Sequence, residues 1–183
     1  MDDDSEPDSR TLIFTPITLD DKPYLSRLLK NRDIAQNFVK GSEYLDSEIG
    51  DILDKMLHFW INNNLGFYMV KQNDQMIGIA GFNYLSDYDE VEVVYCVDKH
   101  LWGQGLATLV LKKLMKIGIE EFNLSKLLGV VKEENLGSYK VLEKNGFNFV
   151  KKFKEHGQNY ILLEVNNILG THKTFLNPKE VGL

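Results

Sequence analysis

The residues from Trp102 to Ala107 have the spacing of an anion-binding turn. Their sequence, WGQGLA, follows an apolar stretch over residues 91–97 and precedes an amphipathic stretch over residues 106–122. A strand, a glycine turn and a helix in this order present unpaired backbone N–H groups and the positive end of a helix dipole to an anion. Gly103 and Gly105 allow the backbone to approach a ligand closely. We therefore interpret this turn as a pyrophosphate site.

Two familiar phosphate motifs do not fit the turn. No Gly-Lys-Ser/Thr follows it, as a P-loop requires, and Thr108 stands where G-x-G-x-x-G has its third glycine. Glycine turns also open helices that bind nothing. The turn alone is therefore equally compatible with a plain tight turn.

The residues that most often hold metals or act as nucleophiles are sparse. Cys96 is the single cysteine, which excludes an internal disulfide, and a small buried thiol is the usual residue inside a strand pattern. A catalytic thiolate at Cys96 would need an activating histidine brought close by the fold. We expect no metal site, because none of the usual ligand spacings occurs among the histidines, which are His58, His100, His156 and His172.

The elements that must position the turn alternate between strand and helix patterns. Strands are predicted over 12–16, 66–71, 75–84, 90–97, 126–131, 147–154 and 159–165. Helices are predicted from Thr18 to Asn31 and over 46–62, 105–122 and 135–145. The order β-α-α-β-β-β-α-β-α-β-β predicts an α/β (α+β) protein with a mixed sheet of about seven strands. Strands 91–97 and 126–131 flank a helix and should be parallel neighbours. The two helices before residue 62 either wall a substrate site or only cover a sheet face.

Composition favours one soluble domain. The chain has 183 residues, 43% hydrophobic and 26% charged, and no apolar run reaches the length of about 18 residues that a membrane helix needs. The first ten residues lack the features of a signal peptide, so we expect a cytoplasmic protein. We interpret residues 1–10 as an acidic disordered tail, 11–165 as the domain, and 166–183 as a tail or an extension that packs on a partner subunit.

Charge argues against nucleic acid as a partner. The formal net charge is −6, but five of the 27 carboxylates lie in the first nine residues. The remaining 22 nearly balance the 21 basic residues, so the domain lacks the basic excess of a nucleic-acid surface. We expect no membrane partner and either a monomer or a homodimer.

A second motif runs from Asn135 to Phe147, with N-x-x-S followed by V-L-E-K-N-G-F. Together with W-G-Q-G-L-A-T and the element order, it resembles the GNAT superfamily of acetyl-CoA-dependent N-acetyltransferases over residues 11–165. Within that superfamily the chain most resembles the branch that contains the RimJ and RimL type enzymes, which acetylate the N-termini of ribosomal proteins. The resemblance implies a GNAT-like, mostly antiparallel mixed sheet.

The resemblance also implies a binding site for acetyl-CoA. In the family a strand pairs with the pantetheine arm, the glycine turn wraps the pyrophosphate, and the second motif contacts the pantetheine region. Trp102 replaces the glutamine or arginine found in many members, which matters little where backbone N–H groups bind the ligand. The cofactor-binding roles fall on Tyr95, Cys96, Val97, Trp102, Gly103, Gln104, Gly105, Leu106, Ala107, Thr108, Asn135 and Ser138.

The same resemblance indicates the catalytic groups. Glu92 shares a strand face with Val94 and Cys96 and matches the family's base, which takes the amine proton directly or through water. A sheet N–H can stabilise the developing oxyanion. Many members place a tyrosine where this chain has Leu142, and that tyrosine acts as the general acid toward the leaving thiolate of CoA. In this chain Ser138 or Tyr139 would contact the thiolate sulfur instead. The alternatives are an exposed strand glutamate, a helix-surface hydroxyl and a packing aromatic.

These observations predict an enzyme that transfers acetyl from acetyl-CoA to a primary amine by direct attack in a ternary complex. A protein or peptide N-terminus is the leading acceptor, with a polyamine, amino acid or aminoglycoside as the competitor. The missing tyrosine keeps a non-catalytic CoA-binding sensor open. A generic nucleotide-binding protein, which would bind ADP and CoA equally, is the third alternative.

Overall fold

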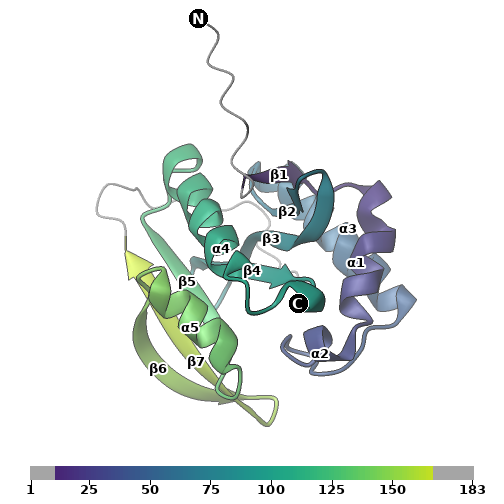
Figure 1. Ribbon diagram of the computed structural model, residues 1–183. Coiled ribbons are helices and arrows are strands. Elements are labelled where there is room, and N and C mark those ends of the chain that lie inside the picture. Colours follow the sequence, from purple (N-terminus) through teal and green to yellow (C-terminus); the bar gives the residue numbers. More distant parts are fainter. Residues whose placement is uncertain (1–10, 167–183) are drawn as a thin grey trace, which may run out of the picture.

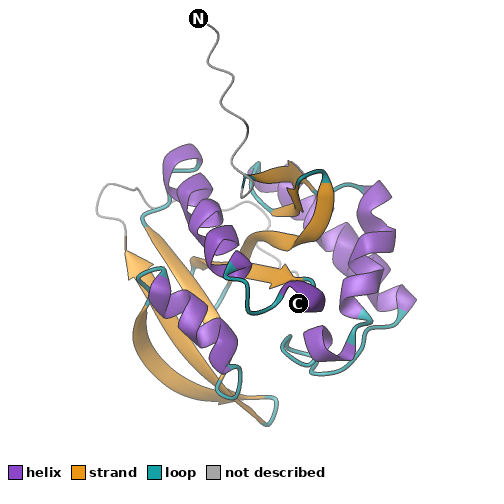
Figure 2. Ribbon diagram, in the orientation of Figure 1, coloured by secondary structure: helices purple, strands orange, loops and turns teal. Residues whose placement is uncertain are grey.

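The computed structural model describes residues 11–166 as one seven-stranded sheet with helices packed against it (Figures 1 and 2). The strands are β1 (Leu12–Pro16), β2 (Phe67–Gln72), β3 (Gln75–Leu85), β4 (Glu90–Val97), β5 (Lys126–Lys132), β6 (Asn148–Glu155) and β7 (Gln158–Asn166). The helices are α1 (Lys22–Leu29), α2 (Arg32–Ala35), α3 (Asp46–Asn63), α4 (Leu106–Lys116) and α5 (Leu136–Lys144). The predictions for residues 1–10 and 167–183 lie outside the described residues. None of the helices within 11–166 has the length and apolarity needed to span a membrane.

The strand order is β1-β2-β3-β4-β5-β7-β6, and every neighbouring pair is antiparallel except β4 and β5. The parallel pairing of these two strands and the mostly antiparallel sheet confirm the predictions. β4 and β5 share a single register pair, Glu92 with Leu128, whereas β3 and β4 pair continuously from Gly78–Val97 to Leu85–Glu90. The sheet is therefore divided into two halves that separate beyond Glu92.

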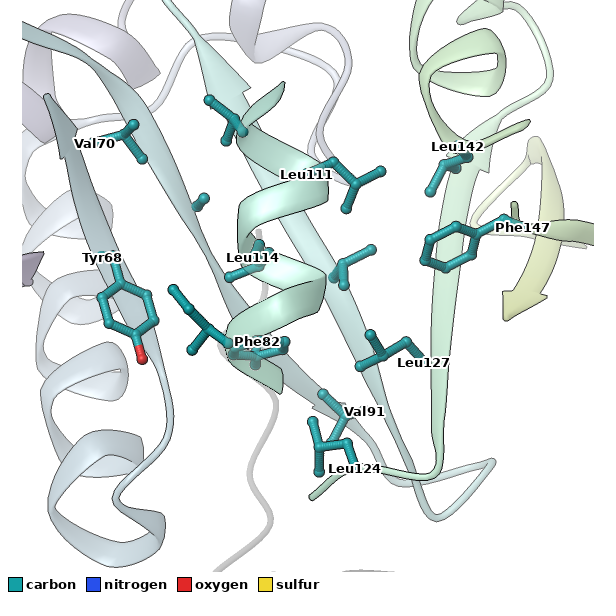
Figure 3. Close-up of a cluster of buried hydrophobic side chains, with 14 of the residues drawn as sticks. Tyr68, Val70, Phe82, Val91, Leu111, Leu114, Leu124, Leu127, Leu142 and Phe147 are labelled. Carbon is teal, nitrogen blue, oxygen red and sulfur yellow. The ribbon is translucent and has the colours of Figure 1, made fainter. Parts of the chain in front are cut away.

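Helices cover the sheet on both faces. Figure 3 shows Leu111 and Leu114 of α4 facing the side chains of the strands, with Leu142 and Phe147 beside them. On the other face α1, α2 and α3 pack against Phe67, Met69 and Ile79, and Figure 1 shows these helices grouped apart from α4 and α5. Burial on both faces explains why β3 reads as an almost continuous apolar run rather than an alternating one.

Two helix boundaries differ from the predictions. α1 ends at Leu29, and Asn31 is the N-cap of α2, a short helix that the sequence pattern did not predict. The Asn31 side chain accepts hydrogen bonds from the N–H groups of Asp33 (3.0 Å) and Ile34 (3.4 Å), so it opens a helix instead of ending one. α4 ends at Lys116, and a π-helical turn, Ile117–Glu121, continues it.

A close approach between β2 and β3 provides a test of this packing. A Cβ added to Gly81 would lie 2.6 Å from the Cα of Phe67, a backbone atom that cannot easily move. Gly81→Ala should therefore lower the free energy of unfolding by about 1–3 kcal/mol in urea titration. Gly50→Ala in α3 is the control, because its Cβ would meet only the flexible Lys22 Nζ at 3.5 Å, and alanine should raise stability by up to about 1 kcal/mol. Equal stability of the two variants would contradict the described pairing.

Candidate active site

A cleft opens where β4 and β5 separate. It has a volume of about 700 Å³ and follows the facing edges of residues 93–97 in β4 and 129–132 in β5. The glycine turn and the start of α4 close one part of the cleft, and the segment 36–39 after α2 forms another wall. Strand edges that lose their neighbour expose backbone N–H and C=O groups, which must be satisfied by water or a ligand. The cleft is thus a consequence of the single register pair between Glu92 and Leu128.

The glycine turn has the geometry of an anion site. Gly103 and Gly105 have φ values of +79° and +77°, and Gly105 is the N-cap of α4. The N–H groups of Thr108 and Leu109 donate to the Gly105 carbonyl at 3.1 and 3.3 Å. The two N–H groups ahead of these, those of Leu106 and Ala107, precede the first hydrogen bonds of the helix and point toward the turn. A Cβ on either glycine would meet nothing within 4 Å, which leaves room for a bulky anion such as a pyrophosphate.

Side chains of the turn have structural partners. The Trp102 indole N–H donates to the Val97 carbonyl at 2.8 Å and so fixes the turn to the end of β4. The Gln104 amide donates weakly to the His100 carbonyl at 3.4 Å. Gln104 does not line the main cleft but a hollow beside it, together with Lys144. An anion at the turn would therefore meet backbone groups first.

Glu92 lines the cleft beside the last register pair. Asn83, directly opposite on β3 and only 5% exposed, donates from its amide to the Glu92 carboxylate at 2.9 Å. Sequence reasoning missed Asn83. Its signal is a polar side chain inside the apolar run of β3, because a buried amide requires a partner. This hydrogen bond holds the Glu92 carboxylate in one orientation at the strand junction.

The second motif forms the start of α5. Asn135 accepts from the Ser138 N–H and donates to the Ser138 hydroxyl oxygen, both at 3.1 Å. Part of the N-x-x-S pattern is thus helix capping. Both residues also line the cleft, and the Tyr95 hydroxyl donates to the Ser138 carbonyl at 3.2 Å. This bond joins β4 to α5 across the cleft.

Tyr139 and Leu142 lie differently from Ser138. Tyr139 is not among the residues that line the cleft; it packs against the α4 side of the core, and burial together with Glu143 raises the pKa of its hydroxyl. Leu142 is 2% exposed and packs so tightly against Gly129 that a Cβ there would lie 2.7 Å from it. Ser138 is therefore the hydroxyl that the fold presents to the cleft from this motif.

Cys96 lies in the core between β4 and the α1–α3 helices. Burial, with a smaller contribution from Asp98, raises the pKa of the thiol to about 12. The thiol is therefore protonated at neutral pH, which favours packing over nucleophilic attack. Asp98 itself accepts from the Tyr24 hydroxyl at 2.8 Å and from Arg27 at 2.7 Å, so α1 is anchored to the end of β4.

A buried cation at the end of β5 contacts the wall after α2, and sequence reasoning also missed it. Lys132 is 4% exposed, lines the cleft, and donates to the Gln36 carbonyl at 2.7 Å. A lysine at the end of an apolar strand looks in sequence like an ordinary exposed residue. Among residues 11–166, no cluster of three or more histidine, cysteine, aspartate or glutamate side chains has the arrangement of a metal site.

Comparison with known proteins assigns the chain to a family. A family model described as an acetyltransferase (GNAT) domain matches residues 11–148. An uncharacterized N-acetyltransferase p20 from Bacillus licheniformis is 33% identical over 85 residues, which span 46% of this chain and 47% of the relative. The chain thus spans less than half the length of this curated relative.

Two solved structures illustrate the structural likeness. The first is an acetyltransferase from Salmonella typhimurium that modifies the N-terminal serine of ribosomal protein L7/L12; its TM-score is 0.74, with 18% identity, 87% of this chain and 97% of that chain covered. The second is spermidine N-acetyltransferase from Vibrio cholerae in complex with CoA and spermine, with a TM-score of 0.71, 18% identity and coverage of 86% and 96%. At such identities these likenesses concern the fold. The family match covers most of the described residues, and the chain belongs to the GNAT acetyltransferase family.

Proposed function

We propose that this protein transfers an acetyl group from acetyl-CoA to a primary amine, by direct attack in a ternary complex. The leading acceptor is the α-amine of a protein or peptide N-terminus. We propose that the domain over residues 11–165 carries this activity in the cytoplasm, as a monomer or homodimer. The observation that carries the proposal is one cleft that joins a backbone anion site at Gly103–Gly105 to an oriented carboxylate at Glu92.

The residues of the cleft fit coenzyme A. The turn offers helix N-terminal N–H groups and open space beside two glycines, which suits a pyrophosphate. The separated edges of β4 and β5 offer backbone groups to an amide-containing arm, and Asn135 and Ser138 lie on the α5 side. Acetyl-CoA supplies the acetyl group as an activated thioester. The predicted contacts at Tyr95, Cys96 and Val97 remain part of this proposal.

The chain's own groups can perform the proton transfers. The Glu92 carboxylate, held by Asn83, would accept the proton of the incoming amine directly or through one water. The Ser138 hydroxyl oxygen already accepts from Asn135, so its own hydrogen can be donated to the leaving sulfur. Because Leu142 offers no hydroxyl, Ser138 is our candidate for this contact.

The choice of a peptide N-terminus as acceptor follows from the resemblance to the RimJ/RimL branch. The N-terminal acetyltransferase from Salmonella typhimurium supports a peptide amine, whereas the spermidine enzyme supports a small cationic amine. Release of free thiol from acetyl-CoA separates these acceptors, with one pool of peptides and one of polyamines, amino acids and aminoglycosides. We expect release with the peptides. Release with the small amines alone would overturn that acceptor. A protein that binds CoA but releases thiol with neither pool would fit the sensor alternative. A protein that does not bind CoA would overturn the whole proposal.

Glu92→Gln tests the base. We expect kcat to fall by about a hundredfold to ten-thousandfold, because the amide cannot accept the proton, while CoA affinity in calorimetry stays unchanged. Glu90→Gln is the matched control: the same change, on the same strand face two residues away, at a carboxylate that pairs with Lys126 outside the cleft. Equal turnover of the two variants would remove Glu92 from the mechanism.

Gly103→Ala tests the anion site. A methyl group would enter the space beside the turn, so we expect the Kd for CoA to rise about tenfold or more. Gly157→Ala in the β6–β7 turn is the control, since both glycines have a φ of +79° and open space around a Cβ. Both variants should lose about 1–2 kcal/mol of stability from strain, and only Gly103→Ala should bind CoA more weakly. Unchanged CoA affinity in Gly103→Ala would place the phosphates elsewhere.

A further inference from the structure

Lys132 is a buried cation that the proposed chemistry does not use. Its Nζ donates to the Gln36 carbonyl, and within residues 11–166 no carboxylate oxygen lies within ion-pair distance of it. Burial lowers the pKa of the ammonium, and Glu134 opposes that shift from a distance. A buried ammonium has three donors and is costly when they lack acceptors, so this position favours a further oxygen atom.

Other polar groups gather beside the same ammonium. The position that a Cβ would take on Gly41 lies 3.0 Å from Lys132 Nζ and 3.1 Å from the Gln158 amide nitrogen. Gly41 has a φ of +72° and no side chain, so its backbone packs close to these two donors. The Lys132 ammonium and the Gln158 amide nitrogen thus lie close together, and two neighbouring donors suit an oxygen atom and not a cation.

Strand geometry gives the position of Lys132 relative to Glu92. Glu92 and Leu128 are register partners, so their side chains lie on the same face of the sheet. Lys132 is an even number of residues further along β5, which pairs with β7 without a bulge, and it therefore shares that face. Four residues of strand correspond to roughly 13 Å. An extended peptide rises about 3.3–3.6 Å per residue, so the reach from Glu92 toward Lys132 corresponds to about four peptide residues.

We propose that Lys132 recognises a backbone carbonyl or carboxylate oxygen of an extended peptide whose N-terminal amine lies at Glu92. The inference rests on the proposed function and names its acceptor: a peptide of several residues, not a single amino acid and not a polyamine. A polyamine of the same length offers ammonium groups where Lys132 and Gln158 offer donors. Like charge at the wall would repel it.

The test compares acceptor length. Alaninamide, a tripeptide amide and a pentapeptide amide that begin with alanine are assayed for kcat/KM beside spermine. In the wild type we expect kcat/KM to rise about tenfold or more with peptide length, and spermine to show no such gain. Lys132→Met should lower kcat/KM about ten- to hundredfold for the pentapeptide and much less for alaninamide, because the longer acceptor alone loses a charged hydrogen bond. Lys154→Met, at an exposed lysine on β6 outside the cleft, should change neither.

Each contrary result has a definite meaning. A wild type without a length gain, or an equal loss on all acceptors in Lys132→Met, would overturn the role of Lys132. Calorimetric binding of the same peptides to the CoA-loaded protein gives a readout without turnover. Length-dependent binding that Lys132→Met abolishes, in a protein that acetylates nothing, would support the peptide site while the transferase proposal fails. If Lys132→Met does not fold, Lys132→Gln, which keeps a donor for the Gln36 carbonyl but loses the charge, takes its place in the same comparison.

Discussion

A single backbone constraint shapes the whole site: β4 and β5 pair at Glu92 and Leu128 and then separate. Continued pairing would have satisfied the strand edges and produced an ordinary mixed sheet without a cleft. The separation instead leaves two rows of peptide groups facing each other across the cleft. Each half of the sheet compensates with continuous pairing on its other side, β3 with β4 and β7 with β5. The opening is therefore supported by two complete ladders and does not depend on local flexibility.

The same constraint explains why the functional groups lie where they do. Glu92 is the last residue before the opening, and Asn83 orients its carboxylate from the neighbouring strand. Beyond the opening, the Tyr95 hydroxyl reaches the Ser138 carbonyl and holds α5 against β4. At the end of β4, the Trp102 indole N–H donates a hydrogen bond to the Val97 carbonyl. Hydrogen bonds from side chains thus hold the site together where the backbone ladder between β4 and β5 is missing.

Local patterns were sufficient to predict much of this fold. Apolar stretches bounded by turn residues located all seven strands, and Asn73 and Asp74 form the turn between β2 and β3 with positive φ. α2 was missed because its signal is a single capping side chain, Asn31, in a segment without periodicity. Asn83 and Lys132 were missed because burial of a polar residue depends on what the fold places over it. The Asn135–Ser138 pair shows the opposite case, since part of a motif associated with function is also required by the helix it begins.

The position of Trp102 has a spectroscopic consequence. The chain contains two tryptophans, and they occupy contrasting surroundings. Trp60 packs edge-on against Tyr68 and donates to the Phe67 carbonyl, whereas Trp102 is 46% exposed in the glycine turn. Indole emission shifts to longer wavelength in contact with water, so the two rings report separately on the α3 side of the core and on the turn. The protein thus carries an intrinsic fluorophore at the place where a phosphate-bearing ligand would displace water.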